Sequence, residues 1–278
     1  MERCTDSMRV VKPQITHCLA LFEAMSDAGR SHRLTDLAQT LDCPKSSVQR
    51  LLEHLTREGW VEQDDGTGQY RLTLRLAVLG QRYMQSAGIV DATQGILERV
   101  ARESGELVRL TVVDGERLVW IGSAQGAPAG LLYQPSMGGR IVSFATANGK
   151  AWLATLDDEA ACAIALAEGL GRKPENVGPR AISTIDAFRR DLAGVRKAGF
   201  ATAVEEAEAG VAAIAVAIRD PSTGRAMGTT SIAGPIVRLS AERRLQLANL
   251  LDAAARELAR VWPLARTQSL PPKRQVRR

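Results

Sequence analysis

Residues 34–72, LTDLAQTLDCPKSSVQRLLEHLTREGWVEQDDGTGQYRL, decide the fold of the N-terminal part of the chain. Thr35 is typical of a helix N-cap, and the chain-breaking run DCP at 42–44 predicts that the helix ends there. A second helix is predicted over 45–58. The strand-like runs WVEQ and QYRL then flank the turn-forming DDGTG. With a helix predicted over 14–28 by its apolar spacing, this order predicts a winged helix-turn-helix.

The helix predicted over 45–58 has the composition of a DNA-recognition helix, with an apolar stripe and polar residues at its start. Side chains near the N-terminus of such a helix reach furthest into the major groove. Lys and Arg suit guanine, Gln suits adenine, and Ser suits a base or a phosphate. The start of the preceding helix can hold a phosphate, and the wing can reach the neighbouring backbone. The candidate DNA-binding residues are Thr35, Lys45, Ser46, Ser47, Gln49, Arg50 and Arg71.

The overall charge gives no independent support for DNA binding. The chain has 36 Lys and Arg against 31 Asp and Glu, a net charge of +5. Residues 1–75 hold 10 basic and 11 acidic side chains, whereas the last thirteen residues, RTQSLPPKRQVRR, hold five basic ones and no acid. The alternative is a small helical domain whose polar residues only face solvent. The order and lengths of the five elements favour DNA binding over that alternative.

After residue 73 the pattern changes to hairpins and longer helices. Strand-like runs at 107–113 and 117–124 flank Asp114-Gly115-Glu116, and those at 212–220 and 226–234 flank a second turn. Such strand pairs predict an antiparallel sheet with helices around it, and so an α+β chain. A further strand is expected near 130–134, and helices are expected at 74–86, 91–103, 145–156, 158–169, 184–198 and 240–261. The predicted domains are a DNA-binding domain at 12–73, a linker helix at 74–90, an effector-binding and oligomerisation domain at 91–262 and a basic tail at 263–278.

Several other classes of protein are not indicated. The four cysteines form no CxxC pair and the three histidines complete no metal pattern, so we expect no metal, disulfide or cofactor. No apolar run approaches the ~20 residues of a membrane span, and the N-terminus is not of signal-peptide type, so we expect a cytoplasmic protein without a membrane partner. The tail is expected to be disordered, with phosphate contact as the alternative.

An enzyme is the main rival class. The sequence has no GxSxG, GxxxxGK[ST], HExxH or GxGxxG motif, so we expect no catalytic residue. The acidic cluster Glu205, Glu206 and Glu208 has no nucleophile or metal set beside it, and we interpret it as a solvated loop. A hydrolase-like enzyme remains as the alternative.

The segments above, in their order, resemble the IclR family of bacterial transcription regulators over about residues 12–262. The resemblance is carried by residues 34–80, and by LVRLTVVDGERLVWIG, ATANGKAWLA, VRKAGFATAVEEAEAGVAAIAVAIRD and TTSIAGP. It implies a C-terminal domain with a GAF- or PAS-like sheet that binds a small organic acid and thereby changes DNA affinity or transcription. It also implies homodimers through the DNA-binding domains and linker helices, and homotetramers through the effector domains.

The resemblance places the effector pocket residue by residue. The helix start at Ala147-Asn148 matches a segment whose amides hold the effector carboxylate, which agrees with the preference of a helix N-terminus for anions. Lys150 need not point inward. Ser231 matches a family serine that donates to the effector. Five further matching positions depart from the family's polar residues, and these are Arg109, Phe144, Ala203, Ala213 and Ala233.

These departures predict a pocket that is roomier and more apolar than that of a glyoxylate or pyruvate sensor, suited to an aromatic or otherwise bulky carboxylate. Arg109 can bind a second carboxylate or a ring substituent, or it can face solvent, and strand register decides between them. The predicted function is therefore a sequence-specific regulator of double-stranded operator DNA, controlled by such a carboxylate from a catabolic pathway. A DNA-binding architectural protein without an effector is the second alternative.

Overall fold

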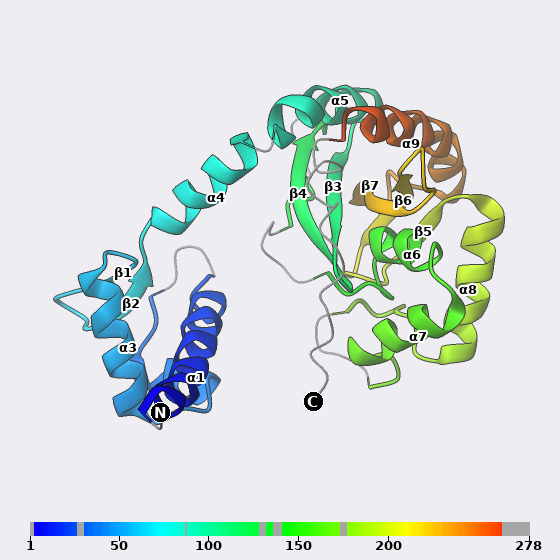
Figure 1. Cartoon of the computed structure of the whole chain (residues 1–278). Coiled ribbons are helices and arrows are strands. Elements are labelled where there is room, and N and C mark those ends of the chain that lie inside the picture. Colours follow the sequence, from blue (N-terminus) through cyan, green and yellow to red (C-terminus); the bar gives the residue numbers. More distant parts are fainter. Residues whose placement is uncertain are drawn as a thin grey trace. The chain divides into compact units, whose positions relative to one another are not determined.

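The computed structural model describes residues 3–26, 31–86, 88–127, 132–135, 141–172 and 177–262. The chain forms two compact units, Met1–Met84 and Gln85–Arg278, which are described separately (Figure 1). No helix among the described residues is long and apolar enough to cross a membrane. The last two residues of the helix expected over 14–28 and the tail at 263–278 lie outside the described residues. Part of the strand expected near 130–134 does so too, and its described residues, 132–134, have no regular structure.

The N-terminal unit is a winged helix-turn-helix. A long first helix precedes the two helices of the motif, and a short antiparallel hairpin forms the wing. The elements are α1 (Arg3–Ala24), α2 (Leu34–Thr40), α3 (Lys45–Arg57), β1 (Val61–Gln63), β2 (Tyr70–Leu72) and the start of α4 (Arg75–Ser86). The core between them consists of Leu21, Met25, Leu37, Val48, Leu52, Leu55, Val61 and Tyr70.

Two details of this unit differ from expectation. Thr35 is not an N-cap, because α2 begins one residue earlier after Arg33, and the Thr35 hydroxyl donates to the Asp36 carboxylate instead (3.1 Å). The cause is the wing. The backbone amide of each of His32 and Tyr70 donates to the carbonyl of the other, and this pairing fixes the point at which the extended segment before α2 ends. On α1, Ile15 is exposed although its spacing predicts an apolar face.

The C-terminal unit is built on one five-stranded antiparallel sheet of order β4-β3-β7-β6-β5. Its elements are α5 (Ile89–Ser104), β3 (Leu107–Asp114), β4 (Arg117–Gln125), α6 (Ala147–Leu153), α7 (Asp158–Ala167), α8 (Ile185–Ala198), β5 (Ala201–Val204), β6 (Val211–Arg219), β7 (Ala226–Pro235) and α9 (Ala241–Val261). The two hairpins and the helices follow the sequence pattern. The edge strand β5, only four residues long, is not predicted from it.

The two faces of this sheet carry different side chains. Alternate residues of a strand point to opposite faces. Leu110 of β3 lies on the face covered by α5. The reason is that its side chain and that of Leu97, which belongs to α5, both approach Gly122 of β4 from the same side. Figure 1 shows α5 and α9 together on that side and α6 on the other. On the α6 side, Asn148 donates to the Thr229 hydroxyl (2.9 Å), so this face of the sheet carries buried polar groups.

Candidate functional site

A small cavity of about 50 Å³ lies on the polar face of the sheet, where α6 begins. It brings together residues from β3, β5, β6, β7 and the start of α6. Seven of the eight candidate effector residues line it, and these are Arg109, Ala147, Asn148, Ala203, Ala213, Ser231 and Ala233. The lining also includes Trp120, Tyr133, Thr146, Ala207 and Val211, which sequence reasoning does not single out.

Strand register brings the predicted residues together. Arg109 of β3 pairs directly with Ser231 of β7. Ala203, Ala213 and Ala233 form a row across β5, β6 and β7. Directly paired residues point to the same face of a sheet. Arg109 is only 6% exposed, so the alternative in which it faces solvent is wrong.

Arg109 is a buried cation held against an aromatic ring. Its guanidinium carbon lies 3.3 Å from the centroid of the Trp120 ring, which is cation–π geometry. Burial lowers the pKa of Arg109 to about 10, so the side chain is still positively charged at neutral pH. Burial, and then the charge of Glu208, raise the pKa of Tyr133 to about 12, so its phenol is neutral. The pocket therefore presents one positive charge in surroundings of low polarity.

A β-bulge explains why Trp120 faces the pocket. The register between β3 and β4 shifts between Leu110 and Thr111, which pair with Gly122 and Trp120 respectively. Without the extra residue, Ile121, strict alternation from the Arg109–Ser123 pair would turn Trp120 to the opposite face. No turn-forming or apolar residue in the sequence marks this bulge. The simple alternation of side chains along a strand therefore places Trp120 on the wrong face.

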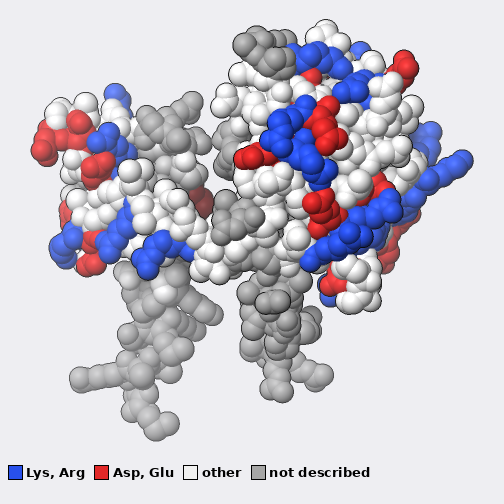
Figure 2. Space-filling model, turned by 90° about the horizontal axis from the view of Figure 1, so that it is seen from above, with Lys and Arg blue, Asp and Glu red and all other residues white. Residues whose placement is uncertain are grey.

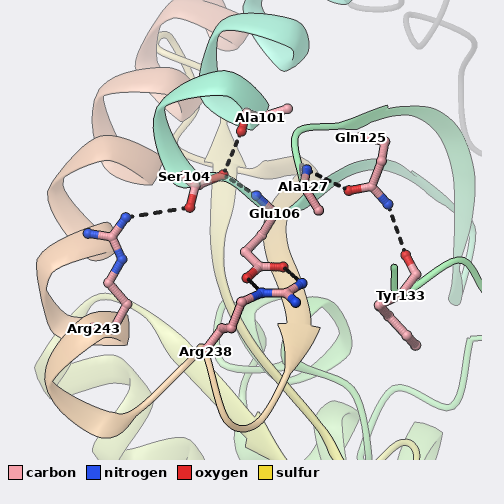
Figure 3. Close-up of polar contacts among 8 residues, drawn as sticks. All are labelled: Ala101, Ser104, Glu106, Gln125, Ala127, Tyr133, Arg238 and Arg243. Atoms are coloured by element: carbon pink, nitrogen blue, oxygen red, sulfur yellow. Dashed lines mark hydrogen bonds and ion pairs between the residues drawn. The ribbon is translucent and has the colours of Figure 1, made fainter. Parts of the chain in front are cut away.

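Tyr133 reaches the pocket from a segment without regular structure. Gln125, the last residue of β4, donates through its amide nitrogen to the Tyr133 carbonyl (3.1 Å) and accepts from the Ala127 backbone nitrogen (3.1 Å). Figure 3 shows this side chain between the two backbone groups. Gln125 thus fixes residue 133 beside the sheet. The sequence predicts a strand near 130–134 and does not predict this contact.

Two expectations for the pocket are wrong. Phe144 does not line the cavity. It is 1% exposed and belongs to the apolar core that also contains Trp152 and Phe188, and it lies within the turn before α6. The pocket is also not roomy, since about 50 Å³ is far below the ~300–1,000 Å³ of typical ligand sites. The space left by the alanines is bordered by the large side chains of Arg109, Trp120 and Tyr133.

Lys150 does not line the cavity, which agrees with the expectation that it need not point inward. Its side chain is 1% exposed, and its ammonium group lies 2.9 and 3.0 Å from the two Glu206 carboxylate oxygens and 3.2 Å from Asp191 Oδ2. Burial raises the pKa of the Glu206 carboxyl, and the charge of Lys150 acts in the opposite direction. The interpretation of the acidic cluster as a solvated loop is therefore wrong for Glu206, although Glu208 is exposed.

The candidate DNA-binding residues form the polar side of α3 and its surroundings. Lys45, Ser46, Gln49 and Arg50 are exposed at the start of the helix, and Ser47 is half-buried. Thr35 and Arg71 are exposed too, and Arg71 forms an ion pair with Glu62 across the wing (2.6 Å). On the face that Figure 2 shows, basic and acidic side chains of this unit are interspersed, in agreement with its near-zero charge.

Family models match both units. The IclR helix-turn-helix domain matches residues 14–65, and the C-terminal domain of the bacterial transcriptional regulator IclR matches residues 81–260. The chain belongs to the IclR family. This IclR-family chain is 27% identical over 241 residues to the transcriptional repressor AllR of Escherichia coli K12, covering 87% of each chain. It is 28% identical over 246 residues to the repressor IclR of the same strain, covering 88% of each.

Solved structures of the family share its fold. A putative IclR transcriptional regulator from Silicibacter sp. TM1040 superposes with a TM-score of 0.75 at 25% identity, covering 89% of this chain and 96% of that one. The α+β fold and the family predicted from the sequence are confirmed. The IclR-family chain is a DNA-binding transcription regulator, and both of the Escherichia coli relatives above are transcriptional repressors.

Proposed function

We propose that this IclR-family regulator reads operator DNA with α3 and is controlled by an aromatic or otherwise bulky carboxylate bound beside Arg109. The observation that carries the proposal is the buried positive charge of Arg109 in a cavity next to the start of α6. Burying a charge is costly unless an opposite charge or suitable dipoles compensate it. A carboxylate bound in the cavity would add paired, charge-assisted hydrogen bonds to the guanidinium group.

Other groups in the cavity also suit an anion. Ser231 of β7 pairs directly with Arg109 of β3, so their side chains point to the same face of the sheet. Ala147 and Asn148 are the first two residues of α6, and the amide N–H groups at the start of a helix have no carbonyl partner within it. The Thr146 hydroxyl accepts from the Gly149 amide (3.1 Å), so a carboxylate would use the two preceding amides, those of Ala147 and Asn148.

The apolar lining favours a ring over a small keto acid. Ala203, Ala213 and Ala233 present only methyl groups, and Trp120 presents a ring face. Since the cavity is small, a bulky effector has to displace Arg109 from Trp120 or move Tyr133. An aromatic effector would replace the lost cation–π contact with ring stacking of its own, whereas pyruvate or glyoxylate would not.

Calorimetry with the full-length protein tests this proposal. The panel consists of benzoate, 4-hydroxybenzoate, phenylacetate and phthalate, with pyruvate and glyoxylate as small acids. We expect at least one aromatic acid to bind at least tenfold more tightly than either small acid. If none binds while operator binding is intact, the architectural alternative without an effector is favoured.

For the DNA surface we expect Gln49→Ala and Arg50→Ala each to relax sequence preference. Each lost base contact costs ~1–3 kcal/mol at its position in the operator. Fluorescence anisotropy on a selected operator and on a scrambled duplex, at one fixed salt concentration, measures the difference. Arg57→Ala, in the last turn of the same helix, is the control. Unchanged affinity and selectivity in both variants would show that α3 does not read bases.

We also propose that the chain assembles as a homodimer or homotetramer. No side chain of α4 is buried, and Leu79 and Tyr83 are 52% and 61% exposed. An isolated helix of this length is marginal in water, so a second copy that covers this face would stabilise it. Analytical ultracentrifugation of the full chain is expected to give a dimer or tetramer, and Leu79→Glu is expected to shift it toward monomer. A wild type that is monomeric at micromolar concentration contradicts the proposal.

A further inference from the structure

We propose that Lys150 is a positioning residue of the effector pocket, which holds the β5–β6 loop, residues 205–210, against α6 through its ion pair with Glu206. The part of this inference that concerns effector affinity rests on the proposed function. The Lys150 ammonium group does not line the cavity. It lies behind it, within 2.9–3.2 Å of carboxylate oxygens from the loop and from α8.

The loop that this ion pair holds forms one wall of the pocket. Ala207 lies in the loop and Val211 directly follows it, and both line the cavity. The negative charge of Glu208, which also lies in the loop, contributes to the raised pKa of Tyr133, a third lining residue. The position of the loop therefore determines where two lining residues lie and where the charge that acts on a third is placed.

The loop is fixed from both sides by different contacts. On its outer side, the Gly178 amide donates to the Glu206 carbonyl (2.7 Å), and Arg180 forms an ion pair with Glu205 (3.1 Å). On its inner side, Lys150 contacts both oxygens of Glu206. Arg180 is 65% exposed whereas Lys150 is 1% exposed, so solvent screens the outer pair far more than the inner one.

A buried ion pair fixes geometry better than it adds stability. Desolvation of the two charges offsets much of their attraction, and apolar residues of similar size often replace such a pair without loss of stability. Loss of one partner alone leaves the other charge buried and uncompensated. Without Lys150, Glu206 would turn toward water and carry Ala207 with it, which would open the wall of the pocket.

The experiment compares three variants of the full-length chain: Lys150→Met, the double variant Lys150→Met/Glu206→Leu, and Arg180→Met. Arg180→Met is the matched control, because it removes the exposed ion pair that Arg180 forms with the same loop. Hydrogen exchange of peptides spanning 204–211 measures how firmly the loop is held, and exchange in β3 and β7 measures whether the sheet stays folded. Calorimetry with benzoate measures the affinity of the pocket. Lys150→Met is expected to raise loop exchange at least tenfold and to weaken benzoate at least tenfold, with β3 and β7 unchanged. Arg180→Met is expected to stay within about threefold of wild type.

The double variant separates positioning from stability. It is expected to recover the unfolding temperature of the wild type and to keep the fast loop exchange and weak benzoate binding. Recovery of all three would overturn the inference, as would wild-type loop exchange in Lys150→Met. If Lys150→Met does not fold, Glu206→Gln, which keeps the shape of the side chain, is measured in its place with the same expected loop exchange. Benzoate that fails to bind the wild type counts against the proposed function, and loop exchange then decides this inference alone.

Discussion

Arg109→Ala is expected to weaken binding of an aromatic carboxylate by about 30-fold or more and to leave operator binding by the free protein unchanged. Truncating one partner of a buried, hydrogen-bonded charge pair typically costs ~2–5 kcal/mol. Among the described residues, Arg109 is the one cation that lines the cavity, so its truncation removes the positive charge of the lining. Ser231→Ala removes one neutral hydrogen bond and is expected to cost only ~1 kcal/mol.

Calorimetry and operator-binding anisotropy on the same preparations measure both effects. Arg117→Ala is the matched control, because Arg117 lies on the neighbouring strand, is 70% exposed and forms an ion pair with Asp114, three positions earlier in the chain. It is expected to change neither affinity. Loss of operator binding or of cooperative unfolding in Arg109→Ala would show that Arg109 supports the fold rather than the effector.

Gly149→Ala is expected to destabilise the C-terminal unit by about 3 kcal/mol or more. A β-carbon at this position would lie 2.1 Å from the Ser143 α-carbon and 2.2 Å from its carbonyl oxygen, so the start of α6 would have to move away from the preceding turn. That turn is itself held, since the Ser143 amide and hydroxyl donate to the Glu168 carboxylate (2.6 and 2.9 Å).

The same substitution at Gly194 provides a control with the opposite sign. A β-carbon there meets no atom within 4 Å, and alanine is the better helix former by ~1 kcal/mol. Gly194→Ala in α8 is therefore expected to stabilise the unit slightly. Urea unfolding with hydrogen exchange in β3 and β7 measures both variants. Equal stability of Gly149→Ala and wild type would contradict the close packing of α6 on residue 143.

The features that follow local patterns were predictable from the sequence. The residues of the apolar stripe of α3, and those of each hairpin turn, act within a few positions of one another. The row of Ala203, Ala213 and Ala233 was also placed, because the family resemblance supplied the alignment and strand pairing then brought the residues together.

The features that were missed depend on interactions between distant parts of the chain. Lys150 and Glu206 are separated by 56 positions, and neither carries a local signal of burial. A bulge in β4 inverts the alternation that would place Trp120. The direction of Phe144 depends on the turn before α6 rather than on a repeating pattern. In each case, tertiary packing determines the orientation of the side chain.

The contact between Arg109 and Trp120 also makes the pocket optically visible. Indole emission responds to a charge over the ring, and here the guanidinium carbon lies 3.3 Å from the ring centroid. Trp152 and Trp262 are buried and do not line the cavity, and Trp60 lies in the other unit. An anion that draws Arg109 away from the ring would change the fluorescence of this one tryptophan. The regulator thus contains a natural, label-free probe with which large collections of candidate acids can be screened in solution.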